Sequence, residues 1–153
     1  MRRLILLLTV LGLIAAGCGG GDDLSIDGQW ARNSPMRADR GAVYMNIESA
    51  DGDRLLSASV DSSISASVEV HETVPVEGEE TEEGMAMMMM QEVEAIELAA
   101  GETVSLKPGG LHIMLIDITA PLEIGQKFDV TLDFENAGPT VVEVEVLEEA
   151  PGS

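Results

Sequence analysis

The sequence predicts an all-β domain, a sandwich or small barrel built from about nine short strands. Short apolar runs alternate with Gly, Pro, Asn and Asp, and no long stretch shows the 3.6-residue period of an amphipathic helix. The clearest strand is Phe128–Phe134, where apolar residues alternate with Asp129, Thr131 and Asp133. This two-residue period is typical of a strand with one buried face.

The other strands are expected where apolar or β-branched residues lie between turn signals. In chain order they are Gln29–Arg32, Ala42–Glu48, Arg54–Val60, Ala66–Glu72, Met87–Val93, Thr103–Leu106, Leu111–Ile118 and Val142–Val146. The last of them should form a hairpin with Phe128–Phe134 around Asn136–Pro139. The segment 75–84 holds five glutamates and few large apolar side chains, so we expect a solvated acidic loop inserted between two strands.

The first residues predict export and attachment to a membrane. Arg2 and Arg3 precede an apolar run that ends at Ala16, which is the layout of a secretory signal peptide over residues 1–17. The run is too short to span a membrane comfortably. The sequence around Gly17-Cys18 resembles a bacterial lipobox, in which the signal is cut before a cysteine that is then lipidated. We expect residues 18–26 to be a lipidated Cys18 and a flexible tether, with an ordinary cleaved signal as the alternative.

Composition limits what the remaining domain, residues 27–149, can do. Cys18 is the only cysteine, which excludes a blue-copper centre, a cysteine nucleophile and a disulfide in that domain. Removal of Arg2 and Arg3 leaves 6 basic against 28 acidic residues, a net charge of −22. Nucleic-acid binding is therefore not expected. The acidic surface could simply be solvated, or it could gather cations and steer a basic partner.

The two histidines of the chain both lie near methionines. His112 and Met114 are two residues apart on an expected strand, so both side chains leave the same face. His71 and a methionine cluster, Met85 with Met87–Met90, lie upstream. Imidazole and thioether form a soft, uncharged ligand set that suits Cu(I), although a histidine or methionine in a strand can also be a packing residue. No set of catalytic residues is evident, so we expect no enzyme.

Several segments resemble the PCuAC family of bacterial extracytoplasmic copper(I) chaperones. They are Gln29–Arg32, Ala42–Met45, Val70–Thr73, Ala100–Val104 and Leu106–Leu115. The family's copper signature is a His, a Met and, after twenty-one further residues, a His-x-Met pair. Here His71 takes the first position, and the twenty-one residues Gln91–Leu111 separate Met90 from His112 and Met114. The insertion 75–84 lengthens the interval after His71, so Met88, on the strand face of Met90, could replace it.

The resemblance implies a cupredoxin-like Greek-key β-sandwich that binds one Cu(I) through His71, Met90, His112 and Met114. It also implies delivery of copper to the dinuclear copper centre of a cytochrome c oxidase subunit, alongside Sco-type proteins. Two other functions stay open at this point. One is a copper scavenging or storage lipoprotein without a specific acceptor, and the other is a β-sandwich interaction module in which histidines and methionines only pack.

Overall fold

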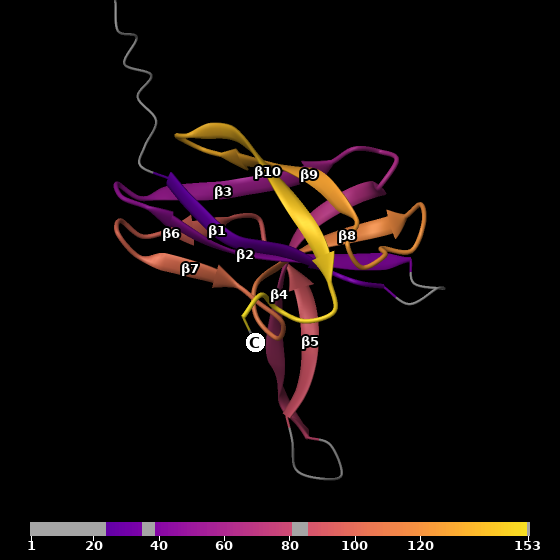
Figure 1. The fold of residues 1–153 in the computed structure, drawn as a ribbon. Coiled ribbons are helices and arrows are strands. Elements are labelled where there is room, and N and C mark those ends of the chain that lie inside the picture. Colours follow the sequence, from indigo (N-terminus) through magenta and orange to yellow (C-terminus); the bar gives the residue numbers. More distant parts are fainter. Residues whose placement is uncertain (1–23, 35–38, 81–85, 153) are drawn as a thin grey trace, which may run out of the picture.

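Ten strands and no helix make up the part of the chain that the computed structural model describes, residues 24–34, 39–80 and 86–152 (Figure 1). The strands are β1 (Leu24–Arg32), β2 (Arg40–Ser49), β3 (Asp53–Val60), β4 (Ser65–Glu80), β5 (Ala86–Glu92), β6 (Ile96–Leu98), β7 (Thr103–Leu106), β8 (His112–Ile118), β9 (Lys127–Phe134) and β10 (Gly138–Leu147). The predicted all-β sandwich is thereby confirmed. Among these described residues, no helix is long and apolar enough to cross a membrane.

The strands follow one continuous path of hydrogen-bonded neighbours, in the order β5-β4-β8-β2-β1-β10-β9-β3-β6, and β7 also pairs with β2. Among the described strands, β1 and β10 are the one pair that runs parallel. In Figure 1, β3, β9 and β10 form the upper layer and β2, β7 and β8 the lower one, with β1 between them. The expected C-terminal hairpin is present as β9 and β10. At one end of the path, β4 and β5 form a hairpin that extends below the sandwich, with β5 as the edge strand.

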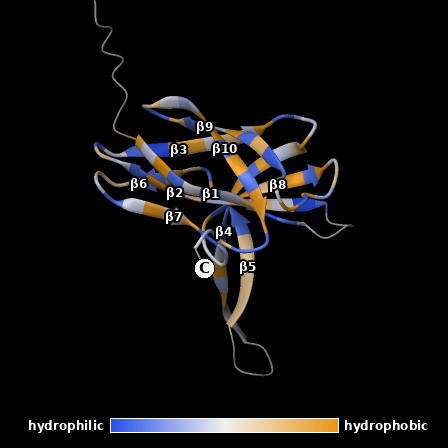
Figure 2. Cartoon of the chain, viewed as in Figure 1, coloured by the Kyte–Doolittle hydropathy of each residue, from blue (hydrophilic) through white to orange (hydrophobic). Residues whose placement is uncertain are grey.

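The core lies between the two layers and comes from one face of the strands of the sandwich, whereas every residue of β5 is exposed. Alternate apolar residues of β2, β9 and β10 are buried, and they meet Ile113 and Leu115 of β8. The same alternation colours the strands in bands of hydrophobic and hydrophilic residues in Figure 2. Because successive side chains of a strand point to opposite faces, His112 and Met114 lie on the face of β8 away from Ile113 and Leu115.

The N-terminal boundary of the domain differs from the expected one. Strand β1 begins at Leu24, which pairs with Ser49, so residues 24–26 belong to the sheet and not to the expected tether. The register of β1 shifts between Asp27 and Trp30, and Gly28 there has a φ of 61°. This bulge interrupts the alternation and explains why the pattern predicts only the second half of the strand. The expected signal peptide, residues 1–17, and Cys18 lie outside the described residues.

Two further differences concern strand bounds. Strand β6 was not expected, because its three residues are too few to show a period. Strand β4 continues to Glu80, so residues 75–80 of the expected acidic loop are strand, with Pro75 opposite Met88 and Glu80 opposite Ala86. Pairing with β5 outweighs the weak strand preference of these residues. Residues 81–85, which include Met85, lie outside the described part.

Candidate metal centre

The two histidines lie directly opposite one another on neighbouring antiparallel strands. His71 of β4 is the register partner of His112 of β8. Their ring centroids are 5.9 Å apart and the ring planes are inclined by 41°. Because a bound metal ion lies about 2.0 Å from an imidazole nitrogen, one ion between the rings can contact both of them.

The ring of His71 is held in one orientation by a carboxylate. Its Nε2 atom lies 2.8 Å from Oε2 of Glu69, two residues earlier on the same face of β4. A carboxylate oxygen only accepts, so Nε2 carries the proton and donates it. The other ring nitrogen, Nδ1, is buried and has no hydrogen-bond partner among the described residues. Its lone pair is therefore available in the neutral ring, the arrangement of a carboxylate–histidine–metal triad.

The ring of His112 is also held by a hydrogen bond, but through its other nitrogen. Its Nδ1 atom lies 3.0 Å from the carbonyl oxygen of Gly110 and donates to it. This bond leaves Nε2 with a free lone pair in the neutral ring. The turn Pro108–Gly110 thus does more than start β8, because its last carbonyl fixes the tautomer of the histidine two residues on.

Two of the expected methionines share the face of the histidines. Met114 is 5% exposed and lies opposite Ala42 of β2 and Glu69 of β4. Met90 lies opposite Thr73 on β5 and is 58% exposed. A hollow of about 350 Å³ is lined by Met90, His112 and Met114 together, and His71 adjoins it through His112. The structure therefore brings all four expected ligand residues to one side of the sheet.

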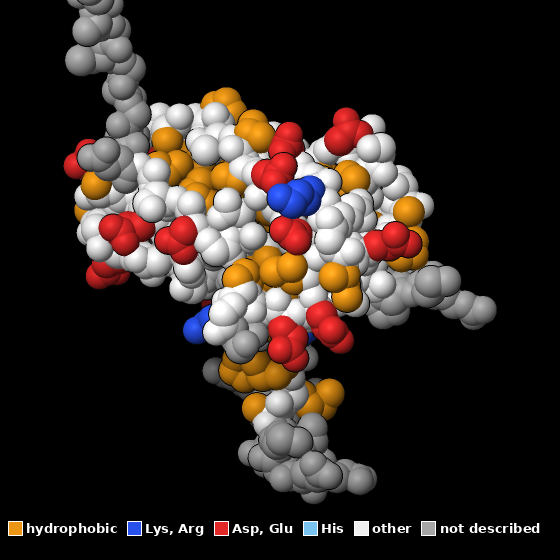
Figure 3. All heavy atoms as spheres, viewed as in Figure 1, with side chains coloured by type: hydrophobic (Ala, Val, Ile, Leu, Met, Phe, Trp, Pro, Cys, Tyr) orange, Lys and Arg blue, Asp and Glu red, His pale blue; other side chains and the backbone are white. Residues whose placement is uncertain are grey.

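The rest of the methionine cluster is farther from the histidines or points elsewhere. Met88 shares the face of Met90 but lies opposite Pro75, one strand repeat closer to the tip of the hairpin. Met89 lies opposite Val74 and so, with Met87, points to the other face of β5. Figure 3 shows hydrophobic side chains gathered on this hairpin below the body of the sandwich. Residues Met87–Met90 are all exposed, by 46% to 58%.

Sequence reasoning missed the residues that support and surround the ligands. Glu69 could have been found, because it precedes His71 by two on the same strand face. Tyr44, Arg32 and Arg40 come from distant segments and also line the hollow. The ring of Tyr44 lies 4.8 Å from that of Trp30 and 6.4 Å from that of His112. Burial raises the pKa of the Tyr44 hydroxyl, and the nearby Arg32 offsets part of this rise.

Fold and site together describe a β-sandwich protein with histidines and methionines on one face, a set of side chains that suits a soft metal ion. The chain belongs to the family described as "Putative lipoprotein LpqE-like", whose model matches residues 24–146. It is 37% identical over 106 residues to a protein of Leifsonia xyli subsp. xyli named "Putative lipoprotein". That match covers 69% of this chain but only 59% of the relative's length.

Solved structures with the same fold include PCuAC domains. The copper-bound PCuAC domain from PmoF2 superposes with a TM-score of 0.62 at 26% identity, over 84% of this chain and 93% of that domain. The Cu(I) form of DR1885 from Deinococcus radiodurans has a TM-score of 0.58 at 22% identity, over 91% of this chain and 89% of that one, and shows the fold alone. The cupredoxin-like sandwich implied by the sequence resemblance is consistent with both.

Proposed function

We propose that the protein is an extracytoplasmic Cu(I) chaperone that binds one ion through His71, Met90, His112 and Met114. One observation carries the proposal: the two histidines face each other while Glu69 and Gly110 occupy one nitrogen of each ring. The remaining nitrogens, Nδ1 of His71 and Nε2 of His112, are the ones free to bind a metal. The structural likeness to a copper-bound PCuAC domain supports copper as that metal.

The chemistry of the ligands favours Cu(I) over the other common metals. Thioether sulfur is a soft ligand that Mg²⁺ and Ca²⁺ do not use, and structural zinc sites in proteins prefer thiolate, imidazole or carboxylate. Thioethers also suit an oxidising compartment, because they cannot be lost to a disulfide. Neutral imidazoles and thioethers bind without redox or acid–base chemistry, which fits a carrier and not an enzyme.

The unequal exposure of the ligands supports transfer over permanent storage. His112 and Met114 are each 5% exposed, whereas Met90 is 58% exposed on the projecting hairpin. An ion on these residues keeps one ligand that an incoming partner can reach and displace. We propose that the ion is delivered to the dinuclear copper centre of a cytochrome c oxidase subunit, directly or with a Sco-type protein, and that a lipid on Cys18 holds the chaperone at the membrane.

An anaerobic titration with Cu(I) against a competing chelator tests the proposal. We expect one tightly bound ion, and affinity at least about tenfold lower for His112→Ala and for Met114→Leu. Zn²⁺ should bind far more weakly than Cu(I). Met89→Leu, which points to the other face of β5, is the matched control and should keep the affinity of the unmodified protein. Unchanged affinity in both site variants would refute the assigned ligands.

A copper store is the second candidate, because Met87, Met88 and Met89 are exposed on the hairpin in addition to Met90. The same titration separates the two functions. Binding of a single ion supports delivery, whereas several ions, with the extra ones lost when Met87, Met88 and Met89 are replaced together by leucine, support storage.

A further inference from the structure

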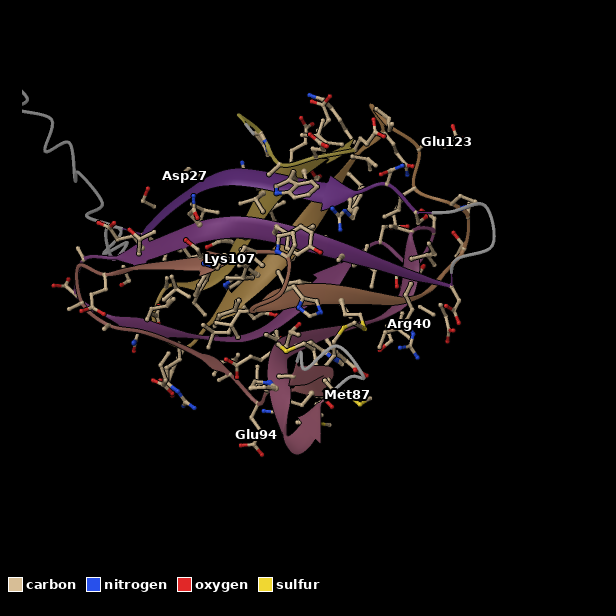
Figure 4. The ribbon with its side chains drawn as sticks, turned by 90° about the horizontal axis from the view of Figure 1, so that it is seen from below. Asp27, Arg40, Met87, Glu94, Lys107 and Glu123 are labelled. Carbon is tan, nitrogen blue, oxygen red and sulfur yellow. The ribbon has the colours of Figure 1, made fainter. Side chains whose placement is uncertain are left out.

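The basic residues of this acidic chain are unevenly distributed. The whole chain has 8 Lys and Arg against 28 Asp and Glu. Away from the hollow, on β3 and β9, Arg54 pairs with Glu97 and Glu135, and Lys127 pairs with Glu143 and Glu145. Arg32 and Arg40, both exposed, have no ion pair with any described residue, and both line the hollow above Met90, His112 and Met114. Figure 4 shows Arg40 in a view from below, to the right of the hairpin that carries Met87.

Among the residues that the structure describes, none of those that line the hollow carries a carboxylate. Besides the two arginines, the lining residues are polar, apolar or small, and they include Tyr44, Met90, Pro108, His112 and Met114. Two unpaired guanidinium groups beside a site for a cation oppose binding of that cation. The arginines therefore do not serve to hold the metal, and their planar donor groups are suited instead to carboxylates.

We infer that the hollow is the docking site for a partner protein that presents carboxylates beside its own copper ligand, with Arg32 and Arg40 donating hydrogen bonds to those carboxylates. This inference rests on the proposed chaperone function, and it names the kind of surface that receives or supplies the ion. Apolar walls from Met90, Met114 and Pro108 between polar rim groups are typical of a protein interface pocket. A membrane surface is flat and does not fill a concave site.

A second copy of this chain is a poorer occupant. Each copy has a net charge of −20, so two copies repel one another unless the contact is local and specific. Because of this net charge, two explanations predict opposite effects for an acidic ligand. Non-specific electrostatics predict that an acidic ligand binds this protein more weakly than a neutral one, whereas docking on Arg32 and Arg40 predicts that it binds more tightly.

Two dye-labelled peptides, one acidic and one neutral, test which of the two effects occurs. Each carries one Met-x-Met pair, flanked by glutamates in one peptide and by glutamines in the other. Fluorescence anisotropy gives their Kd for the metal-free protein, and the Cu(I) affinity of every variant is measured separately, so loss of docking and loss of copper binding are distinguished. The test variant is Arg32→Ser with Arg40→Ser. The control, Arg54→Ser with Lys127→Ser, removes the same amount of positive charge from β3 and β9, away from the hollow.

We expect the glutamate peptide to bind about threefold to tenfold more tightly than the glutamine peptide at about 0.02 M ionic strength, and the preference to shrink at about 0.5 M. The test variant should lose or reverse the preference, and the control should keep it. Equal binding of both peptides, or a preference that survives in the test variant, would overturn the inference. So would arginine-dependent binding to phosphatidylglycerol vesicles without any preference between the peptides, or arginine-dependent dimers in sedimentation.

Discussion

Glu69 and His71 share one strand face, and the carboxylate of the first fixes the imidazole of the second at 2.8 Å. This contact leaves Nδ1 of His71 as the nitrogen without a hydrogen-bond partner among the described residues, and so as the one free to bind the proposed Cu(I). We predict that Glu69→Gln lowers Cu(I) affinity by about tenfold and less than His71→Ala does, because orienting partners of metal ligands typically contribute about 10-fold to 100-fold. Chelator competition measures both variants.

The control for Glu69 is another glutamate of the same strand, Glu72, which points to the other face of β4. Glu72→Gln should leave copper affinity unchanged. If Glu72→Gln and Glu69→Gln weaken copper binding equally, the effect of Glu69 is one of general negative charge and the hydrogen bond to His71 has no special role.

Met90→Leu should weaken copper binding more than Met88→Leu. Both side chains lie on the face of the histidines. Met90 lies opposite Thr73, the next residue after His71 on that face of β4, whereas Met88 lies opposite Pro75, one strand repeat farther away. Only Met90 of the two lines the hollow with His112 and Met114. The same competition titration applies, with Met87→Leu on the opposite face as a control. If Met90→Leu leaves Cu(I) affinity unchanged and Met88→Leu lowers it, the copper site lies one strand repeat closer to the tip of the hairpin.

The sequence was sufficient to predict the all-β class and the shared face of His112 and Met114, because both follow from a two-residue period along one strand. It could not predict that His71 lies opposite His112, since the two are 41 residues apart and their pairing depends on β4 and β8 being neighbours. Family resemblance, not periodicity, placed His71 in the site. Arg32 and Arg40 were missed for a related reason. They lie at the end of β1 and the start of β2, and only the pairing of these strands brings both to one hollow.

A buried carboxylate far from the metal face gives a stability prediction. Asp53, 5% exposed, accepts hydrogen bonds from the backbone amides of Arg54, Asn136 and Ala137. Burial alone would raise the pKa of Asp53, but these bonds outweigh it and hold that pKa below its ordinary value. Asp53→Asn should lower the free energy of unfolding by about 1–3 kcal/mol at neutral pH, measured by urea denaturation.

The lowered pKa also sets the sign of the pH dependence. Stability from a carboxylate of depressed pKa is fully present above the unfolded value, about 3.9 for Asp, and is lost as pH falls through the folded value. Asp53→Asn should therefore destabilise the domain less at about pH 3 than at about pH 7. Asp51→Asn, at an exposed position in the preceding turn, is the control and should change little at either pH. An equal loss at both pH values would show that the ionised form of Asp53 contributes nothing.

Membrane attachment should depend on Cys18 and copper binding should not. The residues before β1 are expected to be a cleaved signal, a lipidated cysteine and a tether, and the candidate site is built from β4, β5 and β8. We predict that Cys18→Ser either moves the protein from the membrane fraction to the soluble extracytoplasmic fraction or leaves it with an uncleaved signal, because serine has no thiol to receive the lipid. Fractionation and intact mass measurement distinguish these results, and Ser25→Ala, beyond the cysteine, is the control. Normal anchoring of the Cys18→Ser protein at the mass of the mature chain would mean that the lipobox assignment is wrong.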